Sequence, residues 1–173
     1  MTKAKKNIVL TGFMGTGKTA VGRELARMLD MKLVDIDSEI EAEEGMKISE
    51  IFGRFGEQYF RDAETRVIRR ISQGAGMIIS TGGGAVLREE NIELLRRNAA
   101  IFCLAASPET ILARTSGNTD RPLLQVEDPM SRIRELLAYR RPFYEKAGDV
   151  IDTDGKTPLQ VAGEIVEKTG CRR

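Results

Sequence analysis

The sequence predicts a three-layer α/β/α protein in which a five-stranded parallel sheet lies between helices. Two observations support this prediction: short apolar runs alternate with amphipathic stretches from end to end, and the first run leads through a glycine-rich turn into a helical pattern. The chain has 173 residues, of which 41% are hydrophobic and 31% are charged. This composition is typical of a globular chain that buries its own core, and we expect a single domain over residues 1–173.

Five apolar runs are the expected strands, at residues 8–10, 32–36, 77–80, 100–104 and 150–151. Capping residues indicate where helices begin between them. The capping box, in which two side chains satisfy free backbone N–H groups, is fitted by two pairs: Ser38 with Glu41, and Thr157 with Gln160. A capping residue stands before a proline at the first helical position in Ser107-Pro108, Asp128-Pro129 and Thr157-Pro158.

The turn after the first strand is a complete phosphate-loop pattern, G-x-x-x-x-G-K-[ST]. It reads Gly12-Phe13-Met14-Gly15-Thr16-Gly17-Lys18-Thr19. Glycines let consecutive N–H groups point at phosphate oxygens, Lys18 adds a positive charge there, and the Thr19 hydroxyl is a ligand for Mg²⁺. The positive end of the following helix adds to the attraction. The sequence therefore predicts a nucleoside triphosphate site, with contacts from Gly15, Thr16, Gly17, Lys18, Thr19 and Ala20.

Charge and composition exclude several other classes of protein. The 27 basic and 26 acidic residues give a net charge of +1, so there is no overall attraction for nucleic acid or an anionic membrane. The absence of histidine excludes histidine-based triads and most zinc sites. No segment approaches the roughly 20 apolar residues of a membrane span. Cys103 and Cys171 are expected to be free thiols, and we expect a cytoplasmic protein without nucleic-acid or membrane partners.

Acidic residues follow the second strand, at the edge of the sheet where parallel α/β proteins bind ligands. The sequence there is Asp35-Ile36-Asp37, and alternation along the strand is expected to place both carboxylates on one side. Two acids at this edge can orient Mg²⁺ through water and accept hydrogen bonds from a substrate hydroxyl. One of them could instead cap the next helix, but Ser38 already fits that task.

Three consecutive glycines, Gly82, Gly83 and Gly84, come shortly after the third strand. They allow a ligand to approach the backbone closely and leave N–H groups free to donate, although a merely flexible loop is the alternative. Many phosphate-loop proteins carry a magnesium-orienting acid at this place. Because this chain has Ser80 and Thr81 instead, that role shifts to Asp35.

Arg61 and Glu64 lie three residues apart on a helix expected after Ser49, and they share one face of it. Taken alone, that spacing favours a solvated surface ion pair, the commonest fate of such pairs. A pair that belongs to a binding site is the alternative, and the spacing does not distinguish the two.

Over nearly its full length the chain resembles the shikimate kinases. Six motifs in family order carry the resemblance: the phosphate loop, Asp35-Ile36-Asp37, Phe60-Arg61 with Glu64, Gly82-Gly83-Gly84, Arg121-Pro122-Leu123-Leu124 and Arg140-Arg141-Pro142-Phe143-Tyr144. It implies the P-loop fold of nucleoside monophosphate kinases and ATP-dependent phosphorylation of the 3-hydroxyl of shikimate, a step of aromatic amino-acid biosynthesis. It also implies a monomer whose partners are ATP and shikimate, with Mg²⁺ as the cofactor.

The resemblance implies a role for each matching position. The implied substrate-binding residues are Asp37, Arg61, Glu64, Gly82, Gly83, Gly84 and Arg140. Among them the two arginines bind the carboxylate, and Asp37 binds hydroxyls and is the candidate base. The implied catalytic residues are Lys18, Asp37 and Arg121, of which Arg121 belongs to a mobile lid at about residues 116–128. Arg114 packs on adenine opposite a wall that ends at Thr157 and Pro158, and Thr19 holds Mg²⁺ together with Asp35 through water.

Two other classes of function remain as alternatives. Another small-metabolite kinase, such as gluconate kinase, would share the phosphate loop, the lid and the size, but has less reason for this pattern of acid, arginine and glycine. A nucleotide switch would carry an N-K-x-D base-recognition motif. The stretch Asp152-Thr153-Asp154-Gly155 has a similar spacing but follows the last strand, which disfavours a switch.

Overall fold

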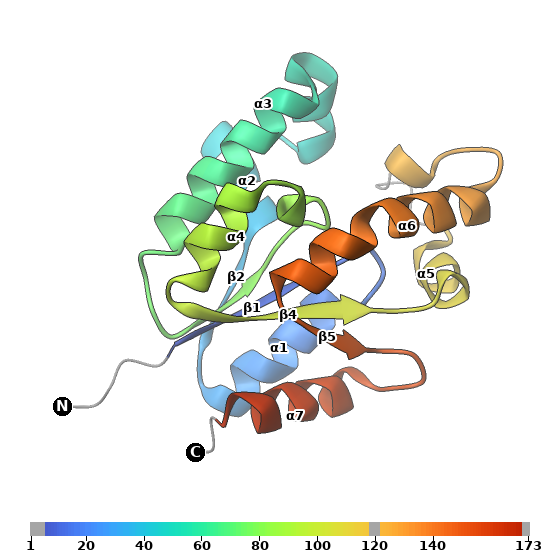
Figure 1. Cartoon of the computed structure of the whole chain (residues 1–173). Coiled ribbons are helices and arrows are strands. Elements are labelled where there is room, and N and C mark those ends of the chain that lie inside the picture. Colours follow the sequence, from blue (N-terminus) through green and yellow to red (C-terminus); the bar gives the residue numbers. More distant parts are fainter. Residues whose placement is uncertain (1–5, 118–121, 171–173) are drawn as a thin grey trace.

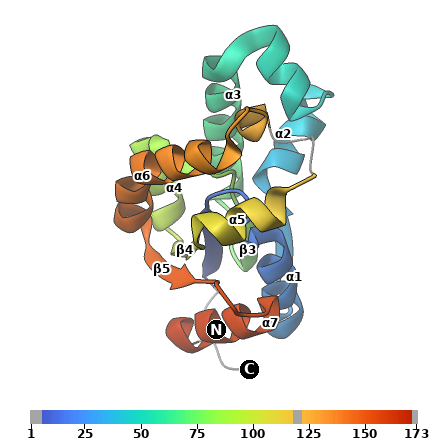
Figure 2. The same ribbon diagram turned by 90° about the vertical axis from the view of Figure 1, so that its right-hand side faces the viewer.

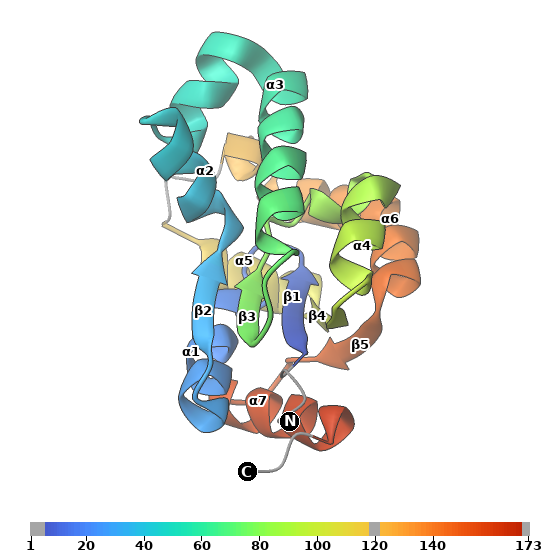
Figure 3. The same cartoon turned by 90° about the vertical axis from the view of Figure 1, so that its left-hand side faces the viewer.

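The computed structural model describes residues 6–117 and 122–170. Within these residues five strands form one sheet: β1 (Asn7–Gly12), β2 (Lys32–Asp35), β3 (Met77–Ser80), β4 (Ala99–Ala105) and β5 (Asp149–Asp152). All neighbouring strands are parallel, and their order is β2-β3-β1-β4-β5 (Figure 3). Each predicted run coincides with a strand, except that the run 32–36 extends one residue beyond β2, and the predicted parallel α/β class is confirmed.

Helices cover both faces of this sheet. The described helices are α1 (Lys18–Leu29), α2 (Ile36–Glu44), α3 (Ile48–Ile71), α4 (Glu89–Arg96), α5 (Pro108–Thr115), α6 (Pro129–Ala147) and α7 (Pro158–Thr169), with the short 3₁₀ helices η1 (Ala85–Leu87) and η2 (Pro122–Leu124). Figure 1 shows α1 and α7 on one face and α3, α4 and α6 on the other. Figure 2 looks at the edge where the strands end, with α5 in front. No helix in the described ranges combines the length and apolar character that crossing a bilayer requires.

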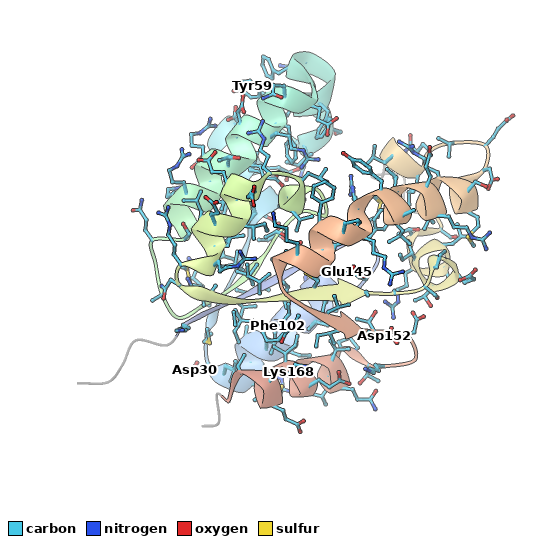
Figure 4. The ribbon with its side chains drawn as sticks, viewed as in Figure 1. Asp30, Tyr59, Phe102, Glu145, Asp152 and Lys168 are labelled. Carbon is cyan, nitrogen blue, oxygen red and sulfur yellow. The ribbon has the colours of Figure 1, made fainter. Side chains whose placement is uncertain are left out.

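The sheet divides the core in two because side chains alternate along each strand. On β4, Ile101 and Cys103 belong to the cluster on the α3–α6 face, whereas Phe102 and Leu104 belong to the cluster that includes α1 and α7. Figure 4 labels Phe102 on this second face. Both faces are therefore filled with apolar side chains, and the carboxyl ends of the strands are left for polar residues.

Three of the predicted helix starts are confirmed. In each, the side chain of the capping residue accepts a hydrogen bond from the backbone N–H three positions later: Ser107 from Thr110, Asp128 from Ser131 and Thr157 from Gln160. Gln160 completes a capping box by accepting from the Thr157 N–H at 2.8 Å. These starts depend on local chemistry alone, which explains why the sequence predicts them well.

The start of α2 differs from the prediction. β2 ends at Asp35, so the strand is one residue shorter than expected, and α2 begins at Ile36. The cap is Asp35, whose Oδ1 accepts a hydrogen bond from the Ser38 N–H at 2.9 Å, and the expected cap at Ser38 is wrong. A carboxylate is favoured there by the positive end of the helix. Asp37 consequently lies in the first turn of α2, and strand alternation does not relate it to Asp35.

The helix expected after Ser49 begins slightly earlier, at Ile48, and it is bent at Gly56. Gly56 has φ 83°, a left-handed conformation that favours glycine. A side chain at this position would meet nothing within 4 Å, so the backbone angle rather than lack of space calls for glycine. The bend separates an outer part of α3 from the part that packs on the sheet (Figure 1).

Part of the predicted lid lies outside the described residues, because residues 118–121 are not described, and Arg121 is among them. Of the remaining predicted lid, Pro122–Leu124 form η2 and Asp128 caps α6. Cys171 also lies outside the described residues, whereas Cys103 is a buried free thiol.

Candidate active site

The phosphate loop connects the end of β1 to the start of α1, and its glycines take conformations that other residues rarely adopt. Gly12, Gly15 and Gly17 have φ values of 136°, 78° and 96°. At Gly12 a side chain would also strike the carbonyl oxygen of Leu104 on β4. Gly17 precedes α1 without a side-chain cap, so the first N–H groups of the helix are open to an anion. The loop has the backbone that phosphate binding requires.

Lys18 folds back across this loop. Its Nζ donates to the carbonyl oxygens of Gly12 at 2.6 Å and Phe13 at 2.9 Å. The Thr16 hydroxyl donates to the same Phe13 carbonyl at 2.7 Å. Thr19 and Ala20 follow in the exposed first turn of α1. The ammonium group is thus held over the loop that it is expected to serve.

Arg114 joins the phosphate loop to the segment after β5. Its Nη1 donates to the Gly15 carbonyl at 3.1 Å and to the Thr153 hydroxyl at 3.2 Å. In the same segment the Asp154 carboxylate accepts from the Ser107 N–H at the start of α5. Thr157 and Pro158 follow at the exposed start of α7. The structure therefore joins Arg114 and the segment after β5 to the phosphate loop, and the nucleotide-base site stays a prediction.

Two carboxyl groups from different helices meet over the glycine loop that follows β3. A side chain at Gly82 would place its Cβ 3.2 Å from Oδ1 of Asp37 on α2 and 3.3 Å from Oε1 of Glu64 on α3. Both oxygens are buried, and neither has a hydrogen-bond partner among the described residues. Buried carboxyl oxygens without partners are rare in folded proteins, which marks this point as a place for donors of a ligand.

Burial shifts the pKa of both groups upward. It raises the pKa of Asp37 to about 6, with a further increase from Asp35, while Lys18 and Arg61 act in the opposite direction. It raises the pKa of Glu64 to about 7, against the lowering effect of Arg61. Both carboxyl groups therefore change charge close to neutral pH.

Arg61 lies beside these carboxyl groups rather than in solvent. Its Nη1 is 2.8 Å from Oε2 of Glu64, and the two side chains are 12% and 0% exposed. The surface ion pair favoured by spacing alone is therefore wrong. A Cβ at Gly84 would collide with the guanidinium group, lying 2.6 Å from Nη1, so glycine is what lets Arg61 rest against the loop.

Arg140 reaches the same loop from α6, on the other side. A Cβ at Gly83 would lie 3.3 Å from its Nη1, and the residue is only 5% exposed. Its guanidinium carbon lies 5.7 Å from the centre of the Phe13 ring, which belongs to the phosphate loop. Its Nε is buried without a partner among the described residues. Two guanidinium groups and two carboxyl groups thus surround three glycines next to the phosphate loop.

Two residues at the site stand within the quoted motifs, but the sequence analysis assigned them no role. Phe13 is a variable position of the phosphate loop, and its ring contacts Arg140. Tyr144 donates from its hydroxyl to the Gly83 carbonyl at 2.7 Å. A signal for Tyr144 was available, because it stands four residues after Arg140 and so shares a helix face with it.

Comparisons with known proteins agree with this geometry. The family model described as shikimate kinase matches residues 14–169. A shikimate kinase from Thermodesulfovibrio yellowstonii is 53% identical over 163 residues, which are 94% of each chain. One from Caldanaerobacter subterraneus is 50% identical over 161 residues, 93% of this chain and 94% of its own.

Solved structures give the same result. The shikimate kinase from Acinetobacter baumannii in complex with shikimate has a TM-score of 0.91 at 37% identity, covering 95% of this chain and 93% of that one. The enzyme from Aquifex aeolicus has a TM-score of 0.80 at 31% identity, covering 95% and 96%. These matches extend from the phosphate loop to the last helix, and the chain therefore belongs to the shikimate kinase family.

Proposed function

We propose that the glycine loop at residues 82–84 holds shikimate while the phosphate loop presents ATP to it. The chain is a shikimate kinase, which transfers the γ-phosphoryl group of ATP to the 3-hydroxyl of shikimate and yields shikimate 3-phosphate and ADP. One observation supports the assignment of the site. Two guanidinium groups of low exposure, and two carboxyl groups that each have a buried oxygen without a described partner, converge on three glycines beside the phosphate loop.

The two arginines suit the carboxylate of shikimate. A planar guanidinium group grips a carboxylate through two parallel hydrogen bonds, which lysine does not offer. Arg61 uses Nη1 on Glu64, and the Nε of Arg140 is buried without a described partner. Both groups already have low exposure, so a carboxylate bound between them would be poorly screened by water.

The two acids suit the ring hydroxyls. Oδ1 of Asp37 and Oε1 of Glu64 lack hydrogen-bond partners among the described residues, and each can accept from a hydroxyl. Asp37 is also the candidate base for the 3-hydroxyl. A loose phosphoryl-transfer transition state needs little proton abstraction, so positioning the hydroxyl is the larger part of this role.

On the ATP side, Gly15 to Ala20 are proposed to contact the phosphates, and Lys18 is proposed to neutralise negative charge that develops during transfer. Its bonds to loop carbonyls hold it there before ATP arrives. Arg121, which lies outside the described residues, is proposed to add positive charge from the lid at about 116–128. Arg114 is proposed to pack on adenine, opposite Thr157 and Pro158.

Mg²⁺ fits the residues present. No group of three or more Asp, Glu, Cys or His in the described part of the chain could hold a metal by itself. This agrees with Mg²⁺, which keeps several waters and binds through substrate phosphates and one or two protein oxygens. Thr19 would supply a hydroxyl ligand, and Asp35 would act through water with the oxygen that does not cap α2. When bound, the ion neutralises phosphate charge.

We further propose that residues 1–173 form one domain that works as a cytoplasmic monomer. The described groups that meet at the glycine loop belong to α2, α3 and α6, which pack on the same sheet. ATP and shikimate are the proposed partners. The net charge of +1 gives no general attraction for nucleic acid.

An assay that couples ADP formation to a colour change tests the function. It is run with ATP and shikimate, with ATP and gluconate, and with ATP alone. We expect ADP only with shikimate. Equal or faster ADP formation with gluconate, or formation without any acceptor, would contradict the proposed substrate.

A further inference from the structure

Tyr144 lies on α6 one turn after Arg140, and its side chain is largely buried at 8% exposure. Its hydroxyl donates to the carbonyl oxygen of Gly83 at 2.7 Å, across 61 positions of sequence. Its own carbonyl accepts a bond from the Cys103 thiol on β4 at 3.0 Å. Tyr144 is thus anchored to the sheet at one end and to the glycine loop at the other.

The bond from Tyr144 holds the middle residue of the glycine loop, Gly83, whereas local turns hold the residues on either side of it. The Gly82 carbonyl accepts from the Ala85 N–H at 3.2 Å, and the Gly84 carbonyl accepts from the Leu87 N–H at 3.1 Å. The Gly83 carbonyl receives its bond from Tyr144, which belongs to a distant helix. Three consecutive glycines have wide backbone freedom, so a bond from outside the loop strongly limits where the middle peptide points.

Three functional parts of the site meet at this peptide. A Cβ at Gly83 would lie 3.2 Å from the Gly12 carbonyl of the phosphate loop, 3.3 Å from Nη1 of Arg140 and 3.5 Å from the Tyr144 hydroxyl. The peptide between Gly83 and Gly84 is planar and trans, since the chain has no cis bonds among its described residues. Fixing the Gly83 carbonyl toward α6 therefore turns the Gly84 N–H to the opposite side.

Resting on the proposed function, we infer that Tyr144 is a positioning residue for the acid substrate. Its hydroxyl fixes the Gly83 peptide and stands beside the Arg140 guanidinium, so that loop and arginine are set for the carboxylate before it binds. Tyr144 contacts protein groups and not the reacting atoms. Removing the hydroxyl would leave the loop free to rotate and the acid more weakly held.

The hydroxyl stays a donor throughout the range of an enzyme assay. Burial raises the pKa of Tyr144 to about 12, although the neighbouring Arg140 lowers it. Its effect on substrate binding should therefore not change with pH, whereas effects that act through Asp37 or Glu64 should.

The test replaces Tyr144 with phenylalanine and uses Tyr139→Phe as the matched control. Tyr139 is on the same helix but is 61% exposed, so the control deletes the same hydroxyl group from a side chain that lies in solvent. For Tyr144→Phe we expect the KM for shikimate to rise about tenfold, from loss of one hydrogen bond and an unpaired carbonyl, while kcat and the KM for ATP stay within about twofold. The rise should be the same at acidic and alkaline pH. Tyr139→Phe should match the parent chain.

A rise in both KM values together, or no rise at all, would overturn the inference. A double variant with Tyr144→Phe and Arg140→Lys tests the inference further. Its KM for shikimate should rise by less than the product of the two single effects, because both residues act on the binding of the same carboxylate. A full product would contradict that shared role. If the parent chain itself fails to phosphorylate shikimate, the proposed function fails; if it is active and Tyr144→Phe equals Tyr139→Phe, only this inference fails.

Discussion

Two arginine–glutamate pairs in this chain have the same sequence spacing and the same distance between their charged atoms, but one is exposed and the other is buried. On α1, Arg27 lies 2.8 Å from Glu24, and the side chains are 67% and 33% exposed. On α3, Arg61 lies 2.8 Å from Glu64, and the side chains are 12% and 0% exposed. Water screens the first pair, whereas the second lies at a glycine loop beside Asp37, whose Oδ1 has no hydrogen-bond partner among the described residues. Burial, not spacing, distinguishes a binding group from a surface pair.

The buried pair also costs the folded state more free energy. Removing charges from water is costly, and the partly unsatisfied Glu64 has a raised pKa as a result. On α1, by contrast, both partners of the Arg27–Glu24 pair are open to solvent. The proposed site for an anionic, hydroxylated substrate would account for charged groups at this place.

The largest expected effect extends the comparison to lysines. Lys18→Met should reduce kcat by about a thousandfold, because the charge that faces the transferring phosphoryl group is lost. Lys168, an exposed residue in the last turn of α7 (labelled in Figure 4), is the matched control, and Lys168→Met should leave kcat unchanged. Steady-state rates at saturating ATP and shikimate measure both. A loss under about tenfold for Lys18→Met would remove Lys18 from the catalytic residues.

The next effect separates the two arginines directly. Arg61→Ala should raise the KM for shikimate about a hundredfold, while the KM for ATP changes only a few-fold, because a charge-assisted bidentate contact to the acid is lost. Arg27→Ala should alter neither constant. Equal increases in both KM values for Arg61→Ala would make the Arg61–Glu64 pair structural.

A smaller effect concerns Asp37 and pH. The carboxylate form accepts a hydroxyl proton, and the protonated form does not, so kcat/KM for shikimate should fall as pH drops below the raised pKa of about 6. Initial rates at low shikimate across this range measure it. A flat profile would contradict the role of the Asp37 carboxylate. If Asp37→Asn keeps a near-normal kcat, Asp37 positions the substrate without acting as a base.

The smallest effect is on stability. Glu64 has a folded pKa of about 7, above its ordinary value of 4.5, so the folded state binds the proton more tightly than the unfolded state. Stability of the ligand-free protein should therefore decrease as pH rises from 4.5 to about 7, by roughly 1–3 kcal/mol from this group. Glu64→Gln should remove part of that decrease, and Glu24→Gln should not. Denaturant titrations at both pH values measure it, and an unchanged decrease in Glu64→Gln would contradict the shift.

The sequence predicts the parts of this molecule that depend on local chemistry. The phosphate loop, the five strands and the helix starts at Ser107, Asp128 and Thr157 follow from patterns a few residues long. The start of α2 does not, because Asp35 and Ser38 both have capping side chains and only their surroundings decide which of them caps.

Site features that depend on distant contacts were harder to foresee. The burial of Arg61 and Glu64 depends on packing against a loop some 20 residues away, which spacing on one helix does not reveal. The bond from Tyr144 to Gly83 joins residues 61 positions apart. The family resemblance pointed to Arg61 and Glu64, and the structure shows which groups they touch.

A crystal structure with shikimate and a non-hydrolysable ATP analogue tests the central claim most directly. We expect the carboxylate between the guanidinium groups of Arg61 and Arg140, ring hydroxyls on Asp37 and Glu64, and the phosphates on the loop that contains Lys18. Shikimate bound away from these four side chains would contradict the account.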